Sequence, residues 1–234
     1  MNRYVLSAAL GLSMVSGVGG LSGCRTGKVI TQEQDLTRSR AMGNEAYYEQ
    51  DFERAAEEYG KYAAVRPNEP EVRYRLGMSQ LELERVSAAR TNLGIAHDLA
   101  PTSDLYTEGL GRAIVAGGDQ EELYAFLRNL MDSAVNASTY VTVGKVAYLG
   151  GLHDEAERAF MSAATLTGKD SAAPHRELAR FYQGVGDSDS EILRWRMVLS
   201  FDVADVEANS RLRDLGIIPG PSMALEPETG VPGI

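Results

Sequence analysis

Apolar and small residues recur along the chain with a period close to 34 residues, from residue 36 to about residue 203. An apolar residue followed by a small one marks each period, at Met42-Gly43, Leu76-Gly77, Leu110-Gly111, Val143-Gly144 and Leu178-Ala179. Twelve residues after the small residue stand Ala55, Ala89, Leu123, Ala156 and Glu191, and four further on stand Tyr59, Leu93, Leu127, Phe160 and Trp195. Residues three or four apart share one face of a helix, so each period predicts two helices joined by a turn.

The blocks 42–67, 76–101 and 143–168 carry this pattern best, and the first two close with Pro67 and Pro101. The pattern resembles the tetratricopeptide repeat (TPR), a helix-turn-helix unit of 34 residues. The resemblance implies an all-α fold, a right-handed superhelical solenoid of about five repeats over residues 36–203. Leu123 and Glu191 depart from the small residue that the pattern expects. The alternative is an irregular helical bundle, which gives no reason for five periods to stay in register.

Two further segments follow the repeats. Residues 204–218 mix apolar and charged side chains, which favours a capping helix with one wet face, Asp202 as its N-cap and Gly216 beyond its C-terminus. Residues 219–234 are rich in proline and glycine. That composition predicts a mobile, disordered tail.

The N-terminus has the pattern of an export signal. Arg3 precedes an apolar stretch over residues 4–18, which is shorter than the about 20 residues of a membrane-spanning helix. Leu21-Ser22-Gly23-Cys24 resembles the bacterial lipoprotein lipobox, which implies a signal peptide over 1–23 and acylation, as with palmitate, of Cys24. Residues 24–35 are then expected to form a lipid anchor and a flexible tether. The alternative is an ordinary signal peptide or an N-terminal anchor with an incidental cysteine.

The lipobox resemblance also implies a location. A lipoprotein of this kind is anchored in the bacterial cell envelope and faces the periplasm. Arg25 follows the cysteine, where an aspartate tends to retain lipoproteins in the inner membrane of enteric bacteria, so the outer membrane is favoured by analogy.

Composition and motifs argue against several functions. The 234 residues contain 23 Lys and Arg against 33 Asp and Glu, and a net charge of −10 disfavours nucleic acid as a partner. One cysteine and three scattered histidines disfavour a zinc site, and no catalytic motif is present in the sequence. Asp187, Asp189 and Glu191 lack the frame of a calcium loop. We therefore expect no enzyme activity, no cofactor and no bound metal.

The candidate site follows from the TPR resemblance, because in that family the first helix of each repeat lines a concave groove. The positions that correspond are Arg40, Asn44, Tyr47, Tyr74, Met78, Arg112, Lys145, Tyr148, Arg176 and Arg180. The cations among them form either a basic ladder for an acidic partner or a solvated face that Glu108 and other acids neutralise, and the sequence leaves both readings open. The carboxylate clamp of some chaperone-binding members is matched by Arg40 and Asn44 alone, so it is not expected here.

These features together predict a membrane-anchored scaffold that binds another envelope protein or peptide through the concave face. Pilus assembly, secretion and outer-membrane assembly are settings in which lipoproteins with such repeats occur. An adaptor or regulator of peptidoglycan enzymes is the alternative function, and a catalytic role is the least favoured.

Overall fold

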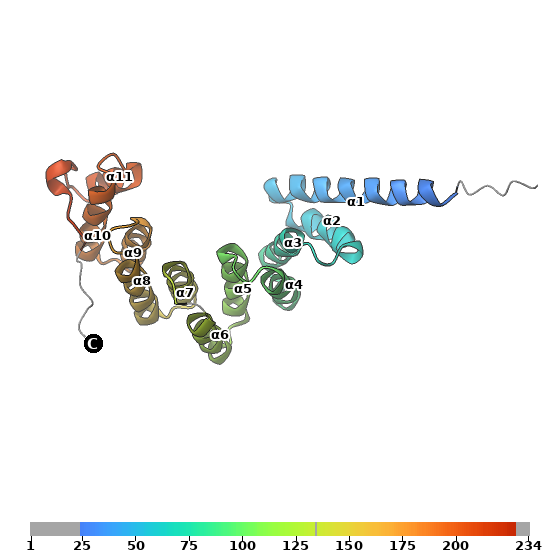
Figure 1. Ribbon diagram of the computed structural model, residues 1–234, viewed down its shortest axis with the longest axis horizontal. Helices are drawn as coiled ribbons and strands as arrows, with labels where there is room; N and C mark the ends of the chain where they lie inside the picture. The colour runs from blue at the N-terminus through green and yellow to red at the C-terminus, as the bar shows by residue number, and fades with distance from the viewer. Residues whose placement is uncertain (1–23, 134, 228–234) are drawn as a thin grey trace, which may run out of the picture. The chain divides into compact units, whose positions relative to one another are not determined.

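The computed structural model describes residues 24–133 and 135–227, with side chains from residue 32 onward. The chain divides into two units, Met1–Arg38 and Ser39–Ile234. In the described part every regular element is a helix (Figure 1). The helices are α1 (Cys24–Tyr48), α2 (Phe52–Val65), α3 (Pro70–Glu82), α4 (Val86–Leu99), α5 (Asp104–Gly117), α6 (Gln120–Ser133), α7 (Ala137–Leu149), α8 (His153–Thr167), α9 (Ala173–Val185), α10 (Ser188–Phe201), α11 (Val206–Asp214) and the short 3-10 helix η1 (Pro221–Met223).

The first unit corrects one prediction. Residues 24–35, expected to form a flexible tether, belong to α1, which begins at Cys24 and ends at Tyr48. The segment contains no proline, and the hydroxyl of Thr37 donates to the backbone oxygen of Glu33 (2.9 Å) within the helix. Extending a helix that already exists costs far less than nucleating one, which explains why a polar sequence is helical here.

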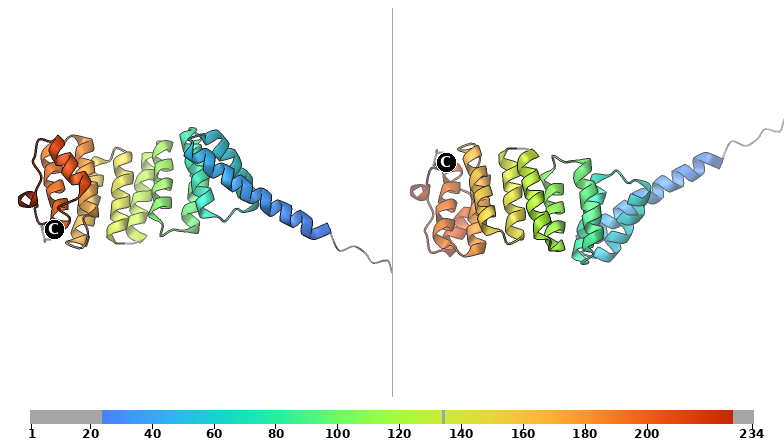
Figure 2. Two further views of the ribbon diagram at one scale, coloured as in Figure 1. Left: turned by 90° about the horizontal axis from the view of Figure 1, so that it is seen from above. Right: turned by 90° about the horizontal axis from the view of Figure 1, so that it is seen from below.

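In the second unit, helices that follow one another in the chain lie side by side from α2 to α10 (Figure 2). The turn within each of the five pairs contains one residue with a left-handed backbone, and these residues stand at equivalent places in the period. They are Gln50, Glu84, Gly118, Gly151 and Gly186. The arrangement is an all-α array of helix pairs, which confirms the predicted fold class.

In the pairs α1–α2, α3–α4 and α7–α8, the small residue that opens the period lies under a large residue of the next helix. A Cβ atom placed on Gly43 would lie 2.9 Å from the ring of Tyr59, and one placed on Gly144 would lie 2.6 Å from the ring of Phe160. Neither distance leaves room for a side chain in a close-packed interior. The small residues of the second helices, Ala55, Ala89 and Ala156, are fully buried. The predicted register therefore describes how the regular pairs pack.

The third pair departs from this packing. Helix α5 packs more extensively against α7 than against its own partner α6. Val146 of α7, rather than Leu127 of α6, covers Gly111, where an added Cβ would meet its side chain at 2.5 Å. Leu123 of α6 packs instead over Gly150, at the end of α7. Because Leu123 is too large for the close crossing that alanine permits, α6 leans away from α5.

The fifth pair has Glu191 where the pattern expects a small residue, and an ion pair stabilises this residue. Glu191 is 2% exposed and accepts hydrogen bonds from the indole nitrogen of Trp195 (3.1 Å) and from Nε of Arg211 on α11 (2.8 Å). A buried carboxylate is tolerated when it is paired and hydrogen-bonded. The capping helix therefore explains why an acidic residue can stand where other pairs have alanine.

Helix α11 lies within the segment predicted to cap the array, but the N-cap residue was assigned wrongly. Asp205, not Asp202, caps the helix, and its carboxylate accepts from the backbone nitrogen of Ala208 (2.8 Å). Asp202 ends α10 and accepts from the backbone nitrogen of Ala204 (2.9 Å). The helix therefore begins at Val206.

The start of the predicted disordered tail is ordered. Nε of Arg196 on α10 donates to the backbone oxygen of Met223 (2.9 Å), and the backbone nitrogen of Leu225 donates to the backbone oxygen of Arg196 (3.0 Å). Ala224 packs against the apolar cluster around Trp195. Hydrogen bonds to Arg196 and the packing of Ala224 thus hold this part of residues 219–227 on α10. Residues 228–234 lie outside the description.

Candidate functional site: the face of the first helices

The first helices of consecutive pairs are neighbours in space, since α3 contacts α5, α5 contacts α7 and α7 contacts α9. Their shared surface, together with residues 39–48 of α1, is called the first-helix face below. The period places equivalent residues of successive first helices next to one another on this face. The candidate residues of the sequence can therefore be located on it one by one.

Four of the candidate residues come together in one cleft on this face, with a volume of about 310 Å³. They are Arg112 of α5, Lys145 and Tyr148 of α7, and Arg180 of α9. The cleft is lined by Glu108, Arg112, Lys145, Tyr148, Leu149, Phe160, Glu177, Arg180 and Phe181. It thus combines charged side chains with aromatic rings.

The cations of the cleft alternate with acids instead of forming a basic ladder. Arg112 pairs with Glu108 (2.9 Å), and Lys145 lies 3.5 Å from Glu108 and 4.0 Å from Glu177. Arg180 pairs with Glu177 (2.9 Å) and also with Glu207 of α11 (2.7 Å). This row, called the charge ladder below, contains three cations and three carboxylates. The geometry favours the reading in which acids neutralise the cations, and it offers no net positive surface.

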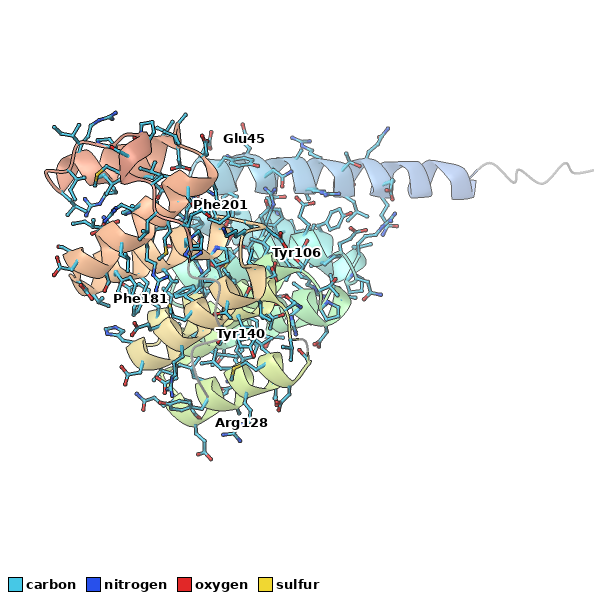
Figure 3. All side chains as sticks on the ribbon, turned by 60° about the vertical axis from the view of Figure 1, so that its left-hand side comes forward. Glu45, Tyr106, Arg128, Tyr140, Phe181 and Phe201 are labelled. Carbon is cyan, nitrogen blue, oxygen red and sulfur yellow. The ribbon has the colours of Figure 1, made fainter. Side chains whose placement is uncertain are left out.

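The aromatic part of the cleft is built around Phe181. Its ring packs edge-on against the ring of Tyr148, with centroids 5.5 Å apart (Phe181 is labelled in Figure 3). The imidazole of His153, the first residue of α8, lies 5.7 Å from the ring of Tyr148. Leu149 beside them is 48% exposed. The cleft therefore offers an apolar contact surface directly next to the charge ladder.

The N-terminal part of the face is aromatic. Tyr47 and Tyr74 pack against a core cluster that contains Met78. Met78 was expected to line the groove, but it is only 7% exposed and belongs to the core. The ring centroid of Tyr106 of α5 (labelled in Figure 3) lies 5.4 Å from that of Tyr74. Tyr106 was missed because the family positions do not include it. Burial raises the pKa of Tyr74, so its hydroxyl stays protonated and can donate a hydrogen bond to a ligand.

Arg75 is a second residue that the sequence did not select. It stands where the carboxylate clamp requires asparagine. Its guanidinium lies 5.7 Å from the ring centroid of Tyr47 and 5.5 Å from that of Tyr48, and it pairs with Glu71 (2.9 Å). A cation held by two rings and a carboxylate is largely satisfied within the protein. A periodic pattern of single residues could not reveal this contact, because it joins α1 to α3.

Three other candidates have partners that give them a structural role. Arg40 pairs with Glu71 (2.7 Å), and Asn44 accepts a hydrogen bond from the hydroxyl of Tyr59 (2.8 Å). Arg176 binds Asp205, the N-cap of α11, at 2.5 Å. These side chains hold neighbouring helices together, and a ligand would have to displace those partners to reach them.

Cys24 is the first residue of α1, but its side chain and residues 1–23 lie outside the description, so the lipidation site stays a prediction. Among residues 24–133 and 135–227 no helix has the length and hydropathy needed to cross a bilayer. Within the same residues no cluster of histidine, cysteine or acidic side chains could hold a metal ion. The carboxylates of the calcium-like segment diverge, because Asp187 caps α10 while Glu191 binds Arg211.

No protein-family model matches the chain, and no curated protein matches its sequence. Solved structures match it in fold. A TPR protein of Thermus thermophilus is 22% identical with a TM-score of 0.50, over 76% of this chain and 97% of that one. MamA from Desulfovibrio magneticus RS-1 is 16% identical (TM-score 0.47, 74% and 97% covered), and a TPR repeats protein of Bacteroides fragilis is 14% identical (0.41, 77% and 97%). The helix pairs, their 34-residue register and the Thermus structure together identify the fold of this chain as a TPR solenoid.

Proposed function

We propose that the chain is a lipid-anchored scaffold of the bacterial cell envelope that binds a partner protein on its first-helix face. The observation that carries the proposal is the cleft in which Arg112, Lys145, Tyr148 and Arg180 come together from three helices. A surface with exposed apolar and charged groups side by side is suited to binding a peptide segment, with a few buried anchors supplying most of the affinity.

The charge ladder indicates the chemistry of the partner. Its ion pairs are largely exposed at Arg112 and Arg180, where 47% of each side chain is accessible, so each pair contributes little and can be exchanged. A segment with both acidic and basic side chains could replace these contacts one for one. An apolar side chain of the same segment would pack against Tyr148, Leu149 and Phe181. The partner we propose therefore carries mixed charges around an apolar anchor.

The location belongs to the same proposal. Acylation of Cys24 would tether the repeats to a membrane facing the periplasm, and the outer membrane is the one we favour. We propose that the scaffold acts in pilus assembly, secretion or outer-membrane assembly. Cys24→Ser should abolish palmitate labelling and processing at Gly23-Cys24. Labelling and fractionation that are unchanged in this variant would contradict the anchor and leave the binding face to be judged separately.

The binding face is tested by crosslinking in the native cell, followed by mass spectrometry of the proteins attached to the chain. The triple variant Arg112→Glu, Lys145→Glu, Arg180→Glu should lose the partner while its circular dichroism stays helical. The matched control reverses the same number of exposed, paired cations on the second-helix side, with Arg54→Glu, Lys61→Glu and Arg85→Glu. Partner recovery at the wild-type level in the first variant, or equal loss in both, would contradict the proposal.

A further inference from the structure

A second groove lies between α6 and α8, over α7, away from the residues of the first-helix face. One end has a volume of about 400 Å³ and is lined by Tyr124, Leu127, Arg128, Met131, Tyr140, Val143, Glu155, Arg158, Ala159 and Ser162. The adjoining end has about 640 Å³ and shares Tyr140, Arg158 and Ser162 with the first. It adds Val135, Glu157, Met161, Thr165 and Leu166. The two volumes form one groove, called the α6–α8 groove below.

The groove follows from the irregular third pair. Helix α6 leans toward α7 because Leu123 packs over Gly150, so its outer side forms one wall instead of covering α5. The wall residues of α6 recur at intervals of three and four, from Tyr124 to Met131, and so lie on one helical stripe. Ala159 and Ser162 on α8 are small, which permits the close approach of another helix.

The apolar lining is open to solvent. Tyr124 is 41% exposed, Val135 71% and Leu166 52%. Met131 and Met161 add flexible side chains that can adjust to a ligand. A continuous apolar groove with exposed aromatic and methionine side chains is typical of surfaces that bind an amphipathic helix.

The charges at the groove differ from those of the first-helix face. Arg128 of α6 (labelled with Tyr140 in Figure 3) makes no ion pair with the described residues, whereas every cation of the charge ladder does. Arg158 on the opposite wall pairs with Glu155 (3.0 Å) only within its own helix, and its side chain is 73% exposed. Glu157 already accepts a hydrogen bond from the hydroxyl of Tyr182 (2.6 Å). Arg128 and Arg158 can therefore bind an acidic group of a ligand at the groove.

We infer that the α6–α8 groove binds an amphipathic helix of a partner protein, with an apolar stripe in the groove and an acidic residue between Arg128 and Arg158. Two helical walls and a helical floor provide a seat for one more helix. A carboxylate placed between the two guanidinium groups forms the charge-assisted hydrogen bonds that Arg128 lacks. The site is separate from the first-helix face, so the scaffold holds two segments at once.

Synthetic peptides test the chemistry of the site on the full chain. The probe is a helical peptide of about 15 residues with leucine at positions i, i+3, i+4 and i+7 and glutamate on its flanks, and its isomer carries lysine in place of glutamate. The acidic peptide should bind about tenfold more tightly than the lysine isomer by fluorescence anisotropy. Arg128→Glu with Arg158→Glu should reverse that order, while Arg213→Glu, which removes an exposed cation elsewhere, should leave it unchanged.

Several outcomes would overturn the inference. These are no binding by either peptide, equal binding by both, or a preference lost only in the triple variant of the charge ladder. The last outcome would place the peptide on the first-helix face and leave the proposed function intact. Loss of partner crosslinking in that triple variant, with peptide binding at the groove retained, would support two separate sites.

The occupant is tested in the native cell with a photoreactive amino acid at Tyr124 and, as a control, at Val203, which is 43% exposed outside the groove. A crosslink from position 124 alone to an amphipathic, acidic helical segment of another protein would support the inference. Crosslinking to residues 228–234 of this chain, to a second copy, or to a segment without that pattern would overturn it. The absence of any crosslink specific to position 124 would do the same.

Discussion

The pairs α3–α4 and α5–α6 share one period but pack in different ways. In α3–α4 a Cβ on Gly77 would lie 2.5 Å from Leu93 and 3.1 Å from the backbone oxygen of Ala89, so the two helices touch backbone to backbone. In α5–α6 the residue that corresponds to Ala89 is Leu123. Val146 of the next repeat, and not a residue of α6, covers Gly111. One side chain at the crossing therefore decides whether a pair closes or splays.

The comparison also shows how a repeat array acquires a local binding surface. In the closed pair α3–α4 the second helix packs directly on the first, whereas the second helix of the splayed pair forms a wall of the α6–α8 groove. The residue at the crossing position is nevertheless buried in both pairs, since Ala89 is 0% exposed and Leu123 is 3% exposed. Exchanging the two residues should therefore destabilise both pairs.

The largest effect is expected for Leu123→Ala. The change removes a buried side chain that packs over Gly150, and restoring the family residue does not by itself return α6 to α5, because Val146 occupies that space. We expect a loss of about 2–5 kcal/mol in the free energy of unfolding, measured by urea denaturation. The control Leu105→Ala, at a position 55% exposed, should change it by less than about 0.5 kcal/mol. A stabilised Leu123→Ala variant would mean that splaying is imposed by something other than this residue.

Two polar side chains in the core differ in whether they have hydrogen-bonding partners. Asn92 of α4 accepts from Arg73 (2.7 Å) and donates to Gln80 (2.9 Å), whereas both ring nitrogens of His175 in α9 are buried without a partner. Burial, and then the charge of Arg194, lower the pKa of His175 from 6.5 to about 4.

This shift predicts a pH dependence of stability. Above pH 6.5 His175 is neutral in both states and adds no pH dependence to the stability, and between about pH 6.5 and 4 only the unfolded chain takes up the proton. The free energy of unfolding should therefore fall by about 3 kcal/mol as the pH drops through that window, with no further fall from this group below pH 4. In His175→Phe this component should vanish. Identical pH profiles for the variant and the wild type would show that the pKa of His175 is not lowered in the folded protein.

The variant Ala89→Leu gives the closed pair α3–α4 the residue type that the splayed pair has at position 123. The new side chain would overpack a crossing where Gly77 already meets Leu93, so we expect a cost of about 1–3 kcal/mol in urea denaturation. Ala116→Leu, at an exposed helical position of α5, is the matched control and should be close to neutral. If the melting temperature of Ala89→Leu equals that of the control, the register of the second repeat is wrong.

The smallest effect concerns the turns of the two pairs. Glu84 turns α3 into α4 with φ of 57°, and Gly118 holds the equivalent place before α6 with φ of 74°. A side chain is strained in this left-handed region, so Glu84→Gly should stabilise the fold by up to about 1 kcal/mol and Gly118→Ala should destabilise it by a similar amount. Shifts of the same sign in thermal denaturation would show that the two turns are not equivalent.

The sequence predicted the regular pairs because their packing depends on residues at fixed spacing. Gly43 and Tyr59, or Gly144 and Phe160, meet because sixteen residues separate them in a helix-turn-helix unit. The departure at Leu123 was visible in the sequence, but its result was not. Where α6 lies depends on Val146, which belongs to the next repeat.

The proximity of four candidate residues was predicted from the sequence, but their pairing with acids was not. The family positions placed Arg112, Lys145, Tyr148 and Arg180 together, as the cleft does. Their pairing with acids of α5, α9 and α11 depends on distances between helices that spacing along the chain does not give. The tail was misjudged for a similar reason. Its composition predicts disorder, but Ala224 meets an apolar surface formed by α10.

The central claim is that a partner protein binds the first-helix face, and a photoreactive amino acid at Leu149 tests it most directly. Leu149 lines the cleft and is 48% exposed, while Leu99, at the end of α4 and 41% exposed, is a control of the same residue type. In the native cell, position 149 should crosslink to one partner protein through a segment with an apolar residue flanked by mixed charges, and position 99 should not. Equal crosslinking from both positions, or none from position 149, would contradict the account.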